Sequence, residues 1–153
     1  MSQITNDTEF KQALQDLDVT QQRTVAAKFV EHVLTLSNQD RIKRAIKVAT
    51  DNDASQDEIS DALRSAKAAT FDSSTRCGAE GNWTDQAGYF VARAAVAVLT
   101  PQIQAKSGGP AWQAAMSCRM AQTSKQIDND SDDIQTHSES EWQYGILSDY
   151  LNS

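Results

Sequence analysis

The sequence lacks the features that mark a secreted or membrane-spanning protein. Only two cysteines, Cys77 and Cys118, occur among 153 residues, and so few thiols suit a reducing compartment. No apolar run approaches the roughly 18 residues that a membrane-spanning helix needs. The N-terminus has neither a basic start nor an apolar stretch, so it does not resemble a secretory signal. We therefore expect a soluble, cytoplasmic protein with no membrane segment.

Enzyme signatures are equally scarce. The chain contains no G-x-S-x-G elbow, no phosphate-binding glycine loop and no H-E-x-x-H pair. No serine stands at a spacing from His32 or His137 that suggests a catalytic triad. The two histidines and two cysteines together match no zinc-binding pattern. We expect no catalytic residues, metal or cofactor, while an active site assembled only in space would leave no such trace.

The charge is acidic and unevenly distributed. The chain has 14 lysines and arginines against 21 aspartates and glutamates, a formal net charge of −7. Residues 86–127 contain bases and no acid, whereas residues 128–153 contain acids and no base. Such a surface repels nucleic acid and attracts a basic protein, because opposite charge steers encounter. An acidic balance also keeps a protein soluble, so charge alone does not establish a partner.

Apolar residues recur at helical spacing almost throughout, without convincing strand alternation. Ser55 and Glu58 form a capping box that begins one helix, and Pro110 is placed to begin another. Residues 83–99 are alanine-rich and apolar on nearly every side, which predicts a central helix with Phe90 buried in the core. The expected helices cover 8–17, 20–36, 39–50, a segment after 55, 83–99, a segment from 110, and a last one around 142–151. We predict an all-α, single-domain bundle of six or seven helices over residues 1–153.

Two arginines in the acid-free stretch are candidates for a structural or partner-binding role. Arg93 lies in the expected central helix, and Arg119 lies near the face of the next helix that carries Trp112 and Met116. A buried guanidinium needs carboxylate or carbonyl partners, because an unpaired buried charge is costly. Residues 86–127 supply no acid, so we expect the partner to come from outside this stretch, with the acidic tail as its source for Arg119. Such an arginine is more often a structural tie than a ligand-binding group.

Positive charge is concentrated on one short segment, at Arg41, Lys43, Arg44 and Lys47. Because no aromatic residues lie between these charges, we expect a solvated face that pairs with the acids of residues 57–61 rather than a phosphate-binding surface. The tryptophans have apolar neighbours at helical spacing and are expected in the core: Trp83, Trp112 and Trp142.

The segment between the last two expected helices is similar to a calcium-binding loop. Asp128, Asp130, Asp132 and Glu139 stand at positions one, three, five and twelve, where EF-hand loops place their oxygen ligands. Position six should be the glycine of a sharp turn but is Asp133, and no second loop accompanies this one. A calcium- or small-ligand-binding regulatory protein is therefore the alternative function, and a solvated acidic linker is the simpler interpretation.

Several short runs follow one another in a distinctive order: Arg44-Ala45-Ile46, Glu58-Ile59, Ala66 with Ala68 and Ala69, Ala87 to Ala95, and Glu141-Trp142-Gln143 with Leu147. This order, which spans about two-thirds of the chain from Arg41 onward, resembles a family of immunity proteins of bacterial polymorphic toxin systems. The chain departs from that family at Tyr89, Phe90 and Val91, where members carry more alanine and histidine. The resemblance implies a small helical protein that neutralises a toxin of its own lineage, and it assigns no binding residues.

We therefore expect a non-enzymatic, acidic helical protein that binds a protein partner. The expected partner is a basic bacterial toxin. The alternative is the calcium- or small-ligand-binding protein described above.

Overall fold

The computed structural model describes residues 4–37, 39–51, 53–80, 83–101, 109–128 and 136–152. Over these ranges the secondary structure is helical, without strands, which confirms the all-α prediction. The helices are α1 (Asp7–Gln15), α2 (Val19–Val33), a 3-10 turn η1 (Leu34–Leu36), α3 (Asp40–Thr50), α4 (Gln56–Glu80), α5 (Trp83–Leu99), α6 (Gly109–Asp128) and α7 (Thr136–Leu151).

Local hydrogen bonds explain where several helices begin. The capping box expected at α4 is present: the Glu58 backbone N–H donates to Ser55 Oγ over 3.1 Å, and the Ser55 N–H donates to Glu58 Oε1 over 3.4 Å. An equivalent box between Asp18 and Gln21 begins α2. These caps satisfy backbone donors that have no partner within the helix, and so they fix each helix start.

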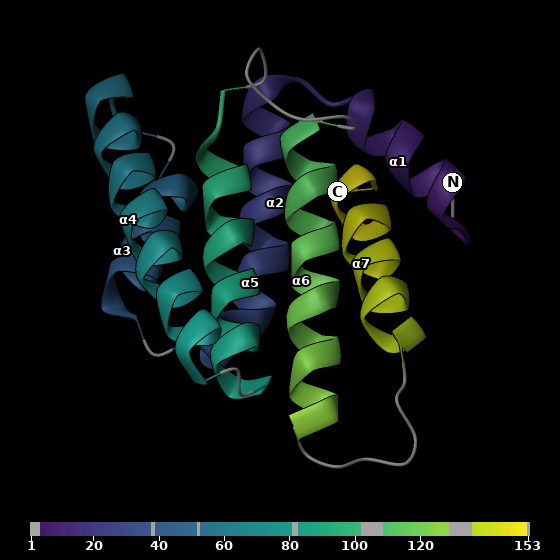
Figure 1. Ribbon diagram of the computed structural model, residues 1–153. Coiled ribbons are helices and arrows are strands. Elements are labelled where there is room, and N and C mark those ends of the chain that lie inside the picture. The colour runs from purple at the N-terminus through teal and green to yellow at the C-terminus, as the bar shows by residue number, and fades with distance from the viewer. Residues whose placement is uncertain are drawn as a thin grey trace.

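The helices form two layers. Figure 1 shows α4, α5, α6 and α7 side by side in one row, with α3 and α2 behind them and α1 beside α7 at one end. The central helix of the row is α5, which contacts α2, α3, α4 and α6. The prediction that residues 83–99 form the central helix is therefore confirmed.

Short side chains dominate the buried surfaces of α5 and α6, which pack against each other. The α5 residues Ala92, Ala94 and Ala95 are fully buried, and α6 buries alanines together with Cys118. Because alanine keeps the two backbones close, dispersion contacts are dense along this contact. Burial also raises the pKa of the Cys118 thiol well above its ordinary value, so this cysteine behaves as a small apolar residue.

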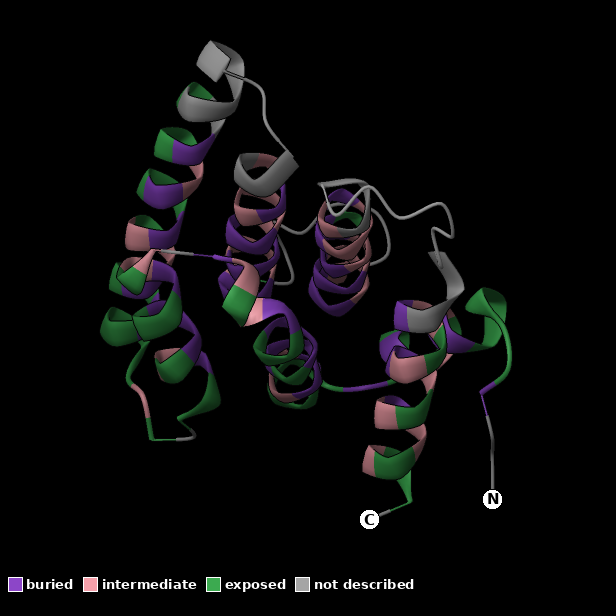
Figure 2. Cartoon of the chain, turned by 90° about the horizontal axis from the view of Figure 1, so that it is seen from below, coloured by how far each residue is buried: buried purple, intermediate pink, exposed green. Residues whose placement is uncertain are grey.

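Each of the helices α1 to α7 contributes residues to the core, and these residues lie on the inward faces of the helices (Figure 2). Its largest fully buried side chains include Phe10 from α1, Phe29 from α2 and Leu147 from α7. Phe90, which we expected at the centre of the core, is only partly buried and packs against the edge of this cluster. The reason is geometric: the inward face of α5 is occupied by Val91 and its neighbours at helical spacing, and Phe90 lies one residue off that face.

Three of the four phenylalanines in the chain provide a graded test of this packing. We expect Phe29→Ala to lower the free energy of unfolding by about 3–5 kcal/mol, because the side chain is fully buried. Phe90→Ala should cost clearly less, and Phe71→Ala should change stability by less than about 0.5 kcal/mol, because Phe71 is 72% exposed. Urea unfolding of the three variants measures the order, and equal losses at Phe29 and Phe71 would contradict the packing described here.

Candidate functional site

A groove of about 370 Å³ opens between α4, α5 and α6. Each helix contributes a pair of side chains that lie one turn apart and therefore face the same way. The pairs are Lys67 and Thr70 from α4, Tyr89 and Arg93 from α5, and Gln113 and Ser117 from α6. Val96, Ala97, Thr100 and Pro110 line the groove as well. Among the described residues, the groove wall thus has two cations, several neutral polar groups, an apolar portion and no acid.

The guanidinium of Arg93 lies against aromatic rings. Its central carbon is 5.7 Å from the ring centroid of Tyr89 and 5.9 Å from that of Phe90. Cation–π attraction holds the charge there, but it leaves the N–H edges of the guanidinium open to other acceptors. Within the described residues, Arg93 makes no ion pair or hydrogen bond, so the expected carboxylate partner is not found for this arginine.

Arg119, the second candidate, donates hydrogen bonds from all three nitrogens of its guanidinium. Its Nε donates to Gln143 Oε1 over 2.9 Å, and its two terminal nitrogens donate to the Asp7 carboxylate over 2.9 and 3.1 Å. Tyr144 Oη donates to the same carboxylate over 2.6 Å. The hydrogen bonds from Arg119 are the main reason that the pKa of Asp7 is lowered. Arg119 therefore ties α6 to α1 and α7, which makes it a structural tie.

The source of that carboxylate differs from the prediction. We expected the acidic tail to pair with Arg119, but the partner is Asp7, in the first turn of α1. The tail region supplies the neutral amide of Gln143 instead, whose Nε2 donates to the Ala115 carbonyl over 3.0 Å. The prediction was wrong because it could not show that α1 packs across α6.

A third cluster joins α2, α6 and α7. The Glu139 carboxylate is 5% exposed and contacts His32 Nδ1 at 3.0 Å, while Gln122 Nε2 donates to it over 3.5 Å. His32 stacks on Trp142, with ring centroids 3.6 Å apart. Burial raises the pKa of Glu139, and the hydrogen bond with His32 opposes this effect without cancelling it.

This cluster bears on the calcium interpretation. Glu139 is directed at α2 and α6, so a calcium ion that used it would have to displace His32 and Gln122. Asp130 and Asp132 lie outside the described residues, and so does the side chain of Asp128. Among the residues that the structure describes, no group of three or more His, Cys, Asp or Glu is arranged to hold a metal ion.

Two further expectations concerned charged and aromatic residues. Lys43, Arg44 and Lys47 are exposed, as a solvated face requires. The expected pairing with residues 57–61 is wrong for Arg41, which pairs with Asp72 at 2.6 Å, and it is not found for the other three among the described residues. Among the tryptophans, Trp112 and Trp142 are partly buried against the core rather than inside it, and the side chain of Trp83 lies outside the described part.

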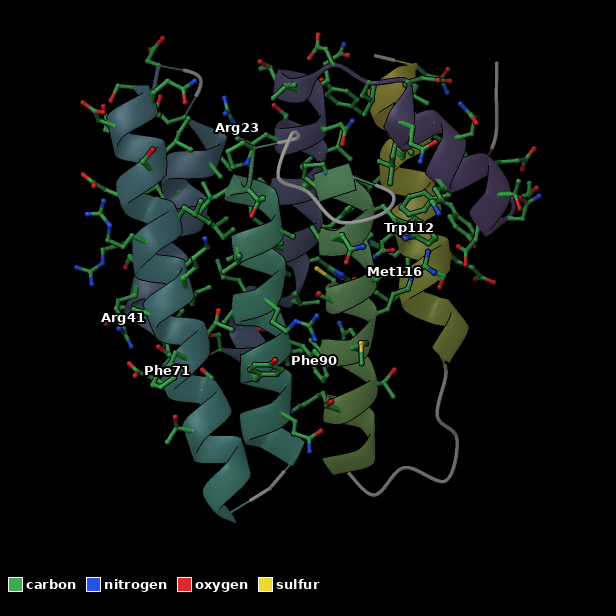
Figure 3. All side chains as sticks on the ribbon, turned by 45° about the horizontal axis from the view of Figure 1, so that its top comes forward. Arg23, Arg41, Phe71, Phe90, Trp112 and Met116 are labelled. Atoms are coloured by element: carbon green, nitrogen blue, oxygen red, sulfur yellow. The ribbon has the colours of Figure 1, made fainter. Side chains whose placement is uncertain are left out.

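The outer face of α4 carries an exposed aromatic side chain that we did not predict. Phe71 is 72% exposed, and Figure 3 places it near Arg41 at one edge of the molecule. The acids Asp57 and Asp61 are exposed on the same helix. The sequence contained a signal for this exposure. Residues 59, 62, 66 and 69 recur at helical spacing on the inward face of the helix, and residue 71 does not share that face.

Comparison with known proteins adds no assignment: no family model, curated protein or solved structure matches the chain. The resemblance to immunity proteins therefore stays a prediction. A search of the described helices found none long and apolar enough to cross a membrane.

Arg119 contacts both Gln143 and Asp7, and substitutions can show which contact contributes more to stability. We expect Arg119→Met to lower the free energy of unfolding by about 2–3 kcal/mol, because it leaves the fully buried Gln143 without a donor for Oε1. Asp7→Asn should cost less than about 1 kcal/mol, since the Asp7 side chain is 51% exposed and water replaces the lost charge. Urea unfolding of both variants measures these values, and a larger loss for Asp7→Asn would contradict this ranking.

The buried carboxylate of Glu139 gives a prediction about pH. Because its folded-state pKa is raised, the folded protein holds this proton more tightly than the unfolded chain does. Stability should therefore rise as the pH falls from the raised pKa toward the ordinary carboxyl value. We expect Glu139→Gln, which mimics the protonated form, to keep or raise the melting temperature at neutral pH and to weaken this rise.

Thermal melts of the intact protein and of Glu139→Gln at several pH values measure the effect. Glu141→Gln is the matched control, because Glu141 is exposed on the same helix. Calcium added at neutral pH tests the alternative function in the same melts, since an ion bound through Glu139 would raise the melting temperature of the intact protein only. A large loss of stability in Glu139→Gln at neutral pH would contradict the assigned sign.

Proposed function

We propose that the chain is a non-catalytic protein-binding domain that recognises a basic protein partner, a bacterial toxin, through the outer face of α4. The observation that carries the proposal is Phe71, an aromatic side chain that is 72% exposed on the same helix as exposed acids. Aromatic residues are enriched among the few residues that dominate binding energy at protein interfaces.

The geometry of α4 supports a continuous contact surface. Asp57, Asp61, Arg64 and Phe71 recur at helical spacing and are all exposed. At 1.5 Å per residue, the distance from the first to the last is about 21 Å, which suits a protein interface. Because α4 lies at one end of the row of helices, a partner reaches this face without displacing another helix (Figure 1).

The charges suit a basic partner. Only Asp61 of the two acids has an ion pair within the described residues, at 3.5 Å from Arg64, and both of these side chains are more than two-thirds exposed. Exposed pairs of this kind are weak, so a partner's lysine or arginine can replace them at little cost. The net charge of −7 adds long-range attraction that raises the association rate with a basic protein.

Neutralisation of a toxin is the specific form of binding that the resemblance implies. The order of short runs that resembles immunity proteins includes the beginning of α4, Glu58-Ile59, and the alanines of its inner face. An inhibitor of this type acts by occupying a surface of its target, so it needs no catalytic residues of its own.

The experiment uses the protein encoded beside this one, because an immunity protein is encoded next to its toxin. We expect the purified pair to bind. Phe71→Ser should raise the dissociation constant at least about 10-fold, as loss of an aromatic anchor does. Asp57→Lys with Asp61→Lys should lower the association rate and its dependence on salt. Calorimetry and surface-based kinetics measure the two effects, and co-expression tests whether binding restores growth.

Leu151→Ser is the matched control, because Leu151 is an exposed apolar residue, 42% exposed, on α7 at the far side of the row. It should leave the dissociation constant unchanged. Failure of the neighbouring protein to bind, or unchanged binding by Phe71→Ser, would refute the proposed interface.

A further inference from the structure

We propose that the groove between α4, α5 and α6 binds a small organic anion. Arg93 and Lys67 would hold its carboxylate or phosphate group, and Val96, Ala97 and Pro110 would contact its apolar body. This site is distinct from the outer face of α4 and does not depend on the function proposed above. The argument rests on the charges that line the groove, the state of Arg93, and the chemistry of the remaining wall.

The charge on the groove wall has one sign. Lys67 and Arg93 both line it, and no acid is found among the described residues that line it. Two of the three walls come from α5 and α6, whose residues from 86 to 127 include no acid although the chain as a whole carries −7. A cleft lined by charges of one sign concentrates ions of the opposite sign. An anion would also relieve the repulsion between the two cations, since like charges in one cleft disfavour each other.

The guanidinium of Arg93 is preorganised to bind such a ligand. The rings of Tyr89 and Phe90 hold its guanidinium at 5.7 and 5.9 Å, which limits the orientations that binding would otherwise have to select. The N–H groups around the edge of a guanidinium match the two oxygens of a carboxylate or phosphate. Arg119 makes the contrast clear, because Asp7 and Gln143 already occupy its N–H groups. Of the two arginines, Arg93 is the one that a ligand can still satisfy.

The two threonine hydroxyl groups of the wall already donate within their own helices. Thr70 Oγ1 donates to the Ala66 carbonyl over 2.8 Å, and Thr100 Oγ1 donates to the Val96 carbonyl over 2.6 Å. An anion needs donors, and the two cations offer the charge-assisted ones, so they recognise it in place of these threonines. The volume of about 370 Å³ lies at the small end of the range for ligand pockets, and the apolar portion of the wall suits a compact hydrocarbon body.

The test uses four probes with the full-length protein: phenyl phosphate, benzoate, inorganic phosphate and benzyl alcohol. We expect phenyl phosphate, benzoate or both to bind in calorimetric titrations at low ionic strength, and to shift the backbone amide resonances of Arg93 and Ser117. Whichever probe binds tighter identifies the head group as phosphate or carboxylate. Inorganic phosphate should bind more weakly than phenyl phosphate because it lacks the apolar body. Benzyl alcohol, which has no charge, should bind weakest.

Three substitutions each remove one positive charge. Arg93→Gln and Lys67→Gln should each weaken binding of the tighter anion about 10-fold or more, the size of a lost charge-assisted contact. Arg64→Gln is the matched control, because Arg64 lies on α4 one turn before Lys67, is 81% exposed and does not line the groove, so it should leave binding within about 2-fold. Lys67 is exposed, so Lys67→Gln keeps the test decisive if Arg93→Gln impairs folding.

Three results would overturn the proposal. The first is the absence of binding by both organic anions at about 10 mM, a concentration at which even weak specific sites are occupied. The second is binding of benzyl alcohol as tightly as of the anions. The third is anion binding that falls equally in Lys67→Gln and Arg64→Gln, which would show a response to net charge alone.

Discussion

The burial of α5 on nearly all sides is the constraint on which the rest of the structure depends. A helix can be surrounded by α2, α3, α4 and α6 only if its side chains are short and apolar, and the alanines and valines of α5 meet that condition. The one lysine or arginine in the sequence of α5, Arg93, must then emerge where two neighbouring helices separate. The groove is that place, so its position and its charge follow from the packing of α5.

The sequence was most informative where the determining interactions are local. Helical periodicity, the capping box at Ser55 and Glu58, and the apolar character of residues 83–99 all depend on residues within a few positions of one another. These features predicted the all-α fold and the central helix. The end of α2 was less predictable, because the chain tightens into a 3-10 turn at Leu34–Leu36 where periodicity continues without interruption.

Tertiary contacts between distant residues could not be predicted in the same way. Arg119 and its partner Asp7 are separated by 112 positions, and His32 lies 107 positions from Glu139. Nothing in the spacing of those residues indicates that they meet, because contact depends on how α1 and α7 pack on the remaining helices. The same limit applied to Phe90, where helical spacing predicted the correct helix but an error of one residue moved the ring from the core to its edge.

Arg93 and Arg119 had the same sequence-based expectation, and the structure separates them by what lies opposite each one. Arg119 faces α1 and α7, which bring a carboxylate and an amide to it, so its charge stabilises the fold. Arg93 faces α4 across a groove whose wall there presents Lys67 and Thr70, and neither can neutralise it. A partly buried charge without a counter-charge disfavours the folded state, which another interaction must offset. The aromatic rings of Tyr89 and Phe90 offset part of that cost, and because no described residue pairs with the guanidinium, the proposed anion would offset the rest.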